Sequence, residues 1–143
     1  MTGEFVVAVH SLVYLDKRQE MLSSDVLAKN VCTNPARIRK VMAKLKKAGL
    51  VKTKEGAEGG YYFFGDPASI TLRQVCEAVD CKPVNTVWRS GSEDMECMVA
   101  SGMSGVLDEL YADLNAHCLR QMENYTLADV GKRLVDRRME KSS

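Results

Sequence analysis

The sequence has 143 residues, enough for one small domain, and 45 % of them are hydrophobic, an ordinary share for a globular protein. The 20 Lys and Arg residues nearly balance the 19 Asp and Glu residues, so the formal net charge is only +1. No apolar run is long enough to cross a bilayer, we expect no signal peptide at the start of the chain, and the spacing of the five cysteines is not typical of a disulfide framework. These features argue against membrane and secreted classes, and we expect a cytoplasmic protein.

The first two predicted helices are short and apolar. Phe5–Tyr14 is apolar almost all round, which is typical of a helix buried on several sides, and we expect His10 to be a hydrogen-bonded residue of the core or of an interface. Ser24 is expected to cap a second helix, which ends near Val31. Three residues, Cys32–Asn34, then lead into the next helix, and this spacing predicts a helix-turn-helix.

The third predicted helix begins a strongly basic stretch. Asn34 is a favourable N-cap, Pro35 suits the first helical position, and Gly49 is a typical helix terminator. Between them, one apolar stripe faces a core at helical spacing: Ile38, Val41, Met42, Leu45 and Ala48. From Asn34 to Lys54 there are eight Lys and Arg residues and no acidic residue, so the rest of the chain has a net charge of −7. Such a concentration of positive charge in a nearly neutral protein predicts a polyanionic partner.

A glycine-tipped hairpin follows this helix. Leu50–Lys54 and Tyr61–Phe64 are predicted as short strands, joined by the turn Glu55–Gly60. A helix-turn-helix followed by such a hairpin is the arrangement of a winged helix-turn-helix. We therefore predict a mainly α-helical fold with a small β-hairpin wing, in which residues 1–80 form the DNA-binding domain.

Three further helices are predicted beyond the wing. Thr71 begins the first with a capping box, and Thr126 begins the last, on which Leu134 is expected to face inward. Residues 82–102 are loop-like, whereas Ser104–Glu123 has the apolar period of a long helix.

The long helix is predicted to form a dimer interface. The winged domain already has enough helices to close its own core, so a further apolar face is best buried against a second copy. The expected interface residues are Val106, Leu107, Leu110, Tyr111, Leu114 and Cys118. We accordingly divide the rest of the chain into a sensor loop, residues 81–102, and a dimerisation helix with its closing helix, residues 103–140.

Candidate contacts with double-stranded DNA lie on the third helix and the wing. The major groove admits a helix whose first turns read base edges, and arginine is the usual reader of guanine, so we expect Arg37 and Arg39 to contact bases. Lysines further along, such as Lys44, are expected to meet phosphates. The complete candidate set is Ser24, Thr33, Asn34, Arg37, Arg39, Lys40, Lys44, Lys52, Lys54, Gly59, Gly60 and Tyr61.

Several of these stretches resemble the Rrf2 family of bacterial transcription regulators. The resemblance is carried by Ser24–Ala28, Leu45–Val51, Gly56–Tyr61 and the segment from Ile70 to Val79. It extends over nearly the whole chain and implies a homodimer that binds pseudo-palindromic operators, with a long C-terminal helix paired across the twofold axis. The iron–sulfur branch of the family has three closely spaced cysteines before that helix, whereas residues 82–105 contain only Cys97. We therefore expect no cluster, metal site or other cofactor.

Cys32 and Cys97 are the candidate sensors of this repressor. Cys32 lies just before a basic helix, whose positive end favours a thiolate, whereas Cys97 lies among Glu93, Asp94 and Glu96, which disfavour one. We predict that Cys32 is oxidised first and that Cys97 of the other subunit then forms a disulfide with it, which releases DNA. The cysteine placement also resembles the thiol-based, hypochlorite- and electrophile-responsive branch of the family.

Alternative functions stay open at this point. The repressor could respond to a protein or metabolite partner instead of an oxidant, in which case its response would survive Cys32→Ser. Binding of a metal or an iron–sulfur cluster is a weaker alternative, because the spacing of Cys76 and Cys81 is not typical of a zinc site. An enzyme with a nucleophilic cysteine would need a paired base, and since none is visible we expect no catalytic activity.

Overall fold

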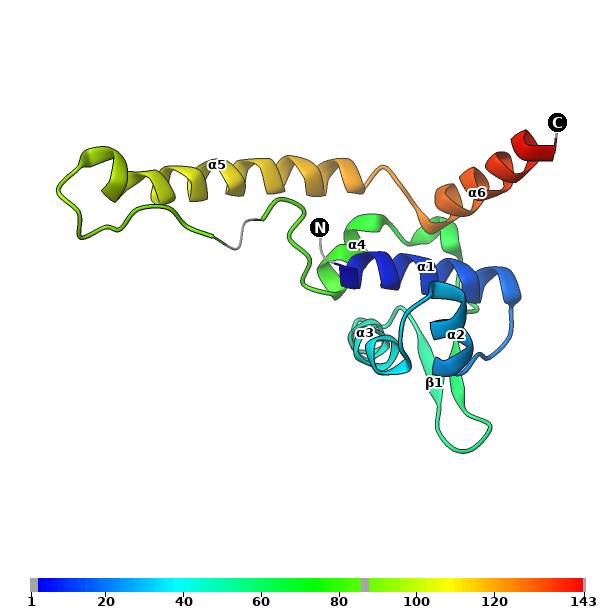
Figure 1. The fold of residues 1–143 in the computed structure, drawn as a ribbon. Coiled ribbons are helices and arrows are strands. Elements are labelled where there is room, and N and C mark those ends of the chain that lie inside the picture. Colours follow the sequence, from blue (N-terminus) through cyan, green and yellow to red (C-terminus); the bar gives the residue numbers. More distant parts are fainter. Residues whose placement is uncertain (1–2, 86–87, 143) are drawn as a thin grey trace.

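A computed structural model describes residues 3–85 and 88–142 of the chain. The described part forms a helical body with a two-stranded antiparallel hairpin, from which α5 extends as an arm before α6 returns to the body (Figure 1). The elements are α1 (Gly3–Arg18), α2 (Ser24–Val31), α3 (Pro35–Lys47), β1 (Lys52–Lys54), β2 (Gly60–Tyr62), the 3-10 turn η1 (Pro67–Ser69), α4 (Leu72–Ala78), α5 (Met98–Met122) and α6 (Leu127–Ser142). The predicted mainly α-helical fold with a small β-hairpin wing is confirmed.

Helix α3 has the boundaries that its sequence predicts. Asn34 Oδ1 accepts a hydrogen bond from the N–H of Arg37 (2.8 Å), and Pro35 occupies the first turn. At the other end Gly49 adopts a φ of 78°, a left-handed conformation that costs a residue with a side chain about 1–2 kcal/mol. Its N–H bonds to the carbonyl oxygen of Lys46 (2.9 Å), which closes the last turn.

The caps of α2 and α4 show where local signals suffice and where they do not. Thr71 and Gln74 form the predicted capping box of α4. The predicted cap of α2 was wrong by one residue, because the Oγ of Ser23 accepts the hydrogen bond from the N–H of Val26 (3.2 Å). Ser24 therefore lies in the first turn of α2 with its side chain free for other contacts.

The hydrophobic core is organised around α1 and α3. Helix α1 contacts α2, α3, α4 and α6, which agrees with its nearly continuous apolar sequence. Helix α3 contributes four side chains with no exposed surface: Ile38, Val41, Met42 and Leu45. These four belong to one cluster with buried residues of α1, α2 and α4, so α3 is held against the body along most of its length.

The wing is shorter than predicted, with three residues in each strand. Lys52 pairs with Tyr62 in an antiparallel register. A single bridge attaches the hairpin to the helix-turn-helix, since the N–H of Tyr61 donates to the oxygen of Leu22 (2.8 Å) and the N–H of Leu22 donates back (2.9 Å). Because Leu22 lies two residues before the start of α2, this bridge fixes the wing beside α2 and α3.

Helix α5 begins earlier than predicted. Its 25 residues, about 37 Å long, start at Met98, inside the segment predicted as loop. The chain after α4 lies beside this helix and is hydrogen-bonded to it. Near the start of α5 the N–H of Ser92 donates to the carbonyl oxygen of Ala100 (3.1 Å). Further along, the N–H of Val84 donates to Asn115 Oδ1 (2.6 Å), and Asn115 Nδ2 donates to the oxygen of Val84 (2.8 Å). Residues 86–87 of the predicted sensor loop lie outside the described residues.

Helix α6 packs on α1 through its first turns. Thr126 and Asp129 form a capping box at its start, and Leu127 is buried. Leu134 was expected to face inward; it lines a groove between α1 and α6 with Val6 and Val13, but this groove is open and leaves it 52 % exposed. His10 is hydrogen-bonded as expected, with its Nε2 at 2.7 Å from the Oδ1 of Asn30, but it is exposed and does not lie in the core. No helix among the described residues has the length and apolarity needed to cross a membrane.

Candidate nucleic-acid interface

Helix α3 turns a basic face away from the body. Its buried residues lie on one side, so the step of about 100° between helical residues brings four exposed residues to the opposite side: Ala36, Lys40, Ala43 and Lys47. Arg37 and Arg39 are also exposed and flank this outward face on its two sides. The small alanines let the helix backbone approach a partner closely, while the cations around them favour an anionic one.

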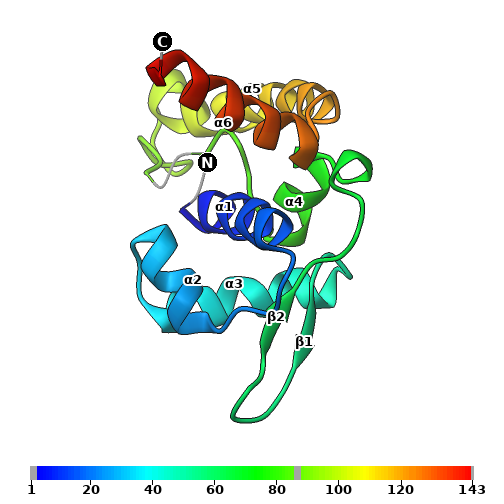
Figure 2. The ribbon, with the colours of Figure 1, turned by 90° about the vertical axis from the view of Figure 1, so that its right-hand side faces the viewer.

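A groove of about 490 Å³ separates α3 from the wing. Side chains from three elements line it: Ser24 from α2, Arg39 and Lys46 from α3, and Lys54 and Glu55 from the wing. Figure 2 shows α3 and the hairpin on the side of α1 opposite to α5 and α6. The groove has three cations and one acid, which suits a polyanion.

Arg39 is held at the middle of this groove. Its Nη1 donates a hydrogen bond to the Oγ of Ser24 (3.3 Å). Tyr61 lines the same groove; burial raises the pKa of its phenol, and the charge of Arg39 partly offsets that rise. Three of the predicted candidates from α2, α3 and the wing are thus brought together.

Lys46 is a groove residue that the sequence interpretation did not select. It lies seven residues after Arg39, which is two helical turns, so both side chains project from the same side of α3. The sequence contained this signal in the row Arg39, Ala43 and Lys46. This signal becomes visible only when the eight cations are assigned to faces of the helix, and not when they are ordered by their distance from the helix start.

The wing contributes backbone and two lysines. Lys52 and Lys54 are exposed on the same face of β1. A Cβ on Gly59 would stand 2.1 Å from the oxygen of Lys54, and one on Gly60 would stand 2.5 Å from the oxygen of Leu22, so neither position admits a side chain without moving backbone. The two predicted glycines therefore allow the close backbone approach of the hairpin to Lys54 and Leu22.

Lys40 and Lys44 have a partner that the sequence interpretation did not anticipate. Glu4 of α1 lies 2.7 Å from Lys44 Nζ and 3.2 Å from Lys40 Nζ. The hydrogen bond from Lys44 is the main reason that the pKa of the Glu4 carboxyl is below its usual value, and Lys40 adds to it. The basic stretch itself contains no acidic residue, and its acidic partner comes from α1, which packs on α3.

The remaining candidates lie at the start of α3. Asn34 uses its side-chain oxygen in the helix cap. Arg37 is exposed, but its guanidinium lies beside α1, where a Cβ on Gly3 would stand 1.9 Å from Arg37 Nη2. Thr33 is half-buried in the turn between α2 and α3. These residues are away from the wing groove, on the other flank of the outward face.

The two candidate thiols differ from the sequence expectation in their surroundings. Cys32 is exposed and ends α2 in a left-handed conformation (φ 65°), with its Sγ at 3.8 Å from the oxygen of Lys29. It therefore faces the carbonyl end of α2 and not the amides of α3. Cys97 is exposed at the N-cap of α5, where the amides of Ala100 and Val99 lower the pKa of its thiol. The expected effect of the nearby acids on Cys97 was wrong, because helix amides prevail there.

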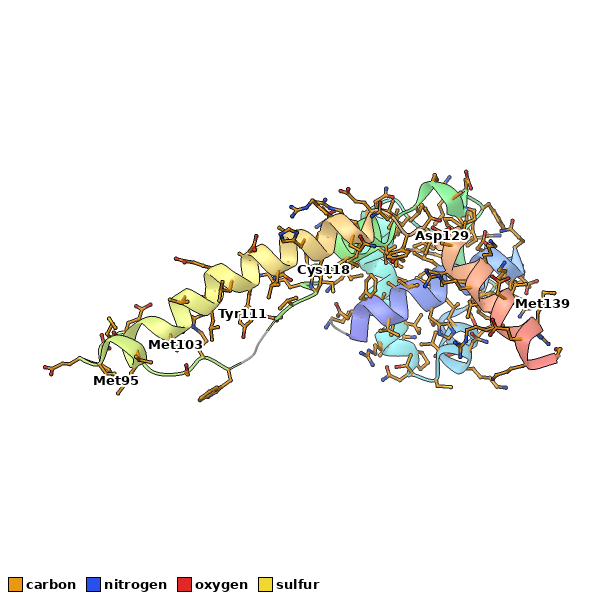
Figure 3. All side chains as sticks on the ribbon, turned by 90° about the horizontal axis from the view of Figure 1, so that it is seen from above. Met95, Met103, Tyr111, Cys118, Asp129 and Met139 are labelled. Carbon is orange, nitrogen blue, oxygen red and sulfur yellow. The ribbon has the colours of Figure 1, made fainter. Side chains whose placement is uncertain are left out.

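The predicted interface residues of α5 divide between two faces (Figure 3). One face is solvent-exposed, with Val106 at 52 %, Leu110 at 53 % and Leu114 at 49 %. The other face is partly covered by the chain itself, since Leu107 and Tyr111 lie with Trp88 around a small cavity and Cys118 packs on the core. Only the first face lacks a covering within the described residues.

Comparisons with known proteins agree on one family. The model of the Rrf2 family, described as an iron-dependent transcriptional regulator, matches residues 1–133. YwnA of Bacillus subtilis (strain 168), named as an HTH-type transcriptional regulator, is 29 % identical over 132 residues, which cover 91 % of this chain and 96 % of that protein. A crystal structure of a transcriptional regulator from Lactobacillus plantarum is similar, with a TM-score of 0.78, 25 % identity and full coverage of both chains.

CymR, the global cysteine regulator of B. subtilis, has the same fold. Its TM-score is 0.65 at 20 % identity, and the match covers 93 % of this chain and 96 % of that one.

The side chains do not fit the iron centre that the family description implies. Among residues 3–85 and 88–142, no group of three or more His, Cys, Asp or Glu side chains is arranged to hold a metal ion. Cys97 is the one cysteine between residues 82 and 105, so the sequence also lacks a compact thiolate donor set there.

We predict that Glu4→Gln destabilises the fold at neutral pH but not in acid. Because the folded-state pKa of Glu4 lies below 4.5, the ion pairs stabilise the protein above pH 4.5, and this contribution disappears as the pH falls through the lower, folded-state pKa. The expected loss at pH 7 is about 0.2–1 kcal/mol in the free energy of unfolding, measured by urea denaturation at pH 7 and pH 3.

Glu58→Gln on the wing is the matched control, since Glu58 makes no ion pair that the structure records among its described residues. An equal loss for Glu4→Gln at both pH values would contradict a charge-dependent contribution.

Proposed function

Because this chain belongs to the Rrf2 family of transcriptional regulators, we propose that it is a homodimeric repressor that reads a specific DNA sequence with α3 and the wing. The relatives are transcriptional regulators and not enzymes, and the chain is accordingly a regulator. The observation that carries the proposal is the groove between α3 and the wing, in which Arg39, Lys46 and Lys54 gather from two elements.

The outward face of α3 suits the major groove of DNA. Ala36 and Ala43 let the helix approach base edges, and Arg37 and Arg39 flank them at the start of the helix, where recognition helices read bases. Lys46 lies further along in the groove and is placed to meet a phosphate, as are Lys52 and Lys54 on the wing.

The exposed face of α5 supports a dimer. Six large apolar side chains on the arm are 39–83 % exposed: Met98, Val99, Met103, Val106, Leu110 and Leu114. A second apolar surface, a groove of about 490 Å³ between α1 and α6, includes Val6, Val13 and Leu134. Burying one such side chain contributes roughly 1.5–3 kcal/mol, so pairing these surfaces between two copies would offset the cost of association. A twofold dimer presents two α3 helices to half-sites about one DNA turn apart.

Oxidation of Cys32 and Cys97 is proposed as the input signal, as in a thiol-based branch of the family. Both thiols are exposed, and the lowered pKa of Cys97 favours its thiolate, which is the form that reacts with oxidants and disulfides. With hypochlorous acid, the two thiols lose two electrons and two protons, one sulfur–sulfur bond forms, and the oxidant leaves as chloride, a proton and water. Helix α5 holds its start far from α2 and α3 of its own chain (Figure 1), so the bond would join two subunits.

Variants on α3 distinguish base reading from phosphate contact. On a duplex that the protein itself selects from a randomised library, Arg39→Ala should weaken binding by roughly 1–3 kcal/mol and affect a random duplex much less. Lys46→Ala should weaken both duplexes similarly and lower the salt slope by about one. Fluorescence anisotropy at several salt concentrations measures both quantities.

Lys132→Ala on the outer face of α6 is the control with the same loss of charge, and it should bind like the wild type. An equal effect of Arg39→Ala on both duplexes would refute its role in base reading.

Leu110→Asp should convert the dimer to monomers, because it places a charge in the middle of the exposed apolar face of α5. Sedimentation velocity measures the loss of the dimer. Ala116→Asp adds the same charge on a different, exposed side of the helix and should remain dimeric. A dimeric Leu110→Asp protein would locate the interface elsewhere.

Oxidation by hypochlorous acid should give a covalent dimer on a non-reducing gel and reduce DNA affinity. Cys32→Ser and Cys97→Ser should each abolish the dimer band, whereas Cys118→Ser should keep it. If affinity does not respond to the oxidant, redox control is excluded and a protein or metabolite partner becomes the favoured input.

A further inference from the structure

The end of α4 brings two buried cysteines into contact. The N–H of Cys81 donates to the oxygen of Cys76 (2.9 Å) and the N–H of Asp80 donates to the oxygen of Glu77 (3.2 Å), with Asp80 in a left-handed conformation (φ 52°). This pair of bonds is a Schellman motif, in which the side chains at the positions of Cys76 and Cys81 characteristically meet. The Sγ of Cys76 donates to the carbonyl oxygen of Cys81 at 3.0 Å.

The two thiols differ in access to solvent. Cys76 has no exposed surface, and burial, together with the neighbouring thiols of Cys81 and Cys118, raises its pKa to about 12. Cys81 is 7 % exposed and lines a cavity of about 640 Å³ between the chain that follows α4 and helix α5. The paired hydrogen bonds between Val84 and Asn115 fix that chain on α5 and so keep the cavity in place.

We propose that Cys81 and Cys76 form a dithiol site that a small neutral peroxide oxidises within one subunit, separately from Cys32 and Cys97. The cavity admits the peroxide to Cys81, and Cys76 lies behind it as the second thiol. This site does not depend on DNA binding or on the dimer.

The oxidation takes place in two steps. The sulfur of Cys81 attacks one oxygen of hydrogen peroxide, the oxygen–oxygen bond breaks, and Cys81 becomes a sulfenic acid while one water leaves. The sulfur of Cys76 then attacks the sulfur of Cys81, the sulfur–oxygen bond breaks, and the hydroxyl group leaves as a second water with the proton of Cys76. Two thiols have lost two electrons and two protons, and the peroxide is reduced to two waters.

The consequence lies at the junction between the body and the arm. Helix α4 ends beside these residues, and the chain from Cys81 to Val84 lies against α5, where Val84 is hydrogen-bonded to Asn115. Cys118 of α5 packs on the same core and lies close enough to influence Cys76. A disulfide here would therefore rearrange the contact between α4 and α5, which joins the DNA-binding body to the proposed dimer helix.

Peptide mapping tests this proposal in a protein carrying Cys32→Ser and Cys97→Ser, which removes the other redox pair. After hydrogen peroxide treatment, free thiols are alkylated under denaturing conditions and the protein is digested. Trypsin leaves both cysteines in one peptide, because no Lys or Arg lies between Cys76 and Cys81, whereas Cys118 lies in another peptide. The expected product is that peptide lacking two hydrogens and both alkyl groups.

Cleavage after Glu77 separates Cys76 from Cys81 in sequence, so the two fragments should stay joined until reduction. Adding Cys81→Ser should leave Cys76 fully alkylated, and adding Cys76→Ser should leave Cys81 as a sulfenic acid that dimedone traps. Cys118→Ser is the control and should form the same bond as its parent. Circular dichroism checks the folding of each variant. If the variant with Cys76→Ser does not fold, the alkylation of Cys76 in the variant with Cys81→Ser decides the test.

A bond from Cys118 to either residue, or oxidation of Cys118 while Cys76 and Cys81 remain reduced, would overturn the proposal. Because the measurement contains no DNA and no sensor pair, a negative result would leave the proposed repressor function untouched.

Discussion

The functional interpretation depends on one constraint, the fixed orientation of α3 about its own axis. Four side chains without exposed surface, Ile38, Val41, Met42 and Leu45, hold the helix against the body. Because successive residues are about 100° apart, this packing determines where every charge on the helix lies. Arg39 and Lys46 lie toward the wing, while Lys44 lies toward Glu4. A core substitution that turned the helix would therefore alter DNA recognition without touching a charged residue.

Two exposed apolar surfaces lie away from this basic face, one on α5 and one between α1 and α6. The long helix α5 leaves the body with Val106, Leu110 and Leu114 half exposed, and contiguous exposed apolar surface of this kind is typical of interaction sites. The groove between α1 and α6 is also apolar, and α1 packs directly on α3, while α5 contacts the body through α4, which packs on both α1 and α3. The proposed pairing of two copies would therefore be linked to the position of α3 through α1 and α4. The thiols at the end of α4 lie on this same connection between arm and body.

Local signals in the sequence predicted much of this fold. Asn34 with Pro35, and Gly49, mark the ends of α3, because capping depends only on neighbouring residues. Signals that depend on distant parts of the chain were missed or misjudged. Glu4 neutralises part of the basic helix only because α1 packs on α3, and the start of α5 is extended by contacts with the chain after α4. Cys97 was judged from its acidic neighbours, whereas its thiol interacts with helix amides that form only once α5 begins at Met98.

Lysine footprinting of the wild-type protein tests the central claim most directly. The protein is treated with an acetylating reagent, free and bound to its selected duplex, and the modification of each lysine is measured by mass spectrometry. The orientation of α3 described above predicts that DNA protects Lys46 and Lys54 strongly and leaves Lys132 and Lys141 on α6 unchanged. Protection of the α6 lysines with unaltered modification of Lys46 would contradict it, because DNA would then bind on the opposite side of α1.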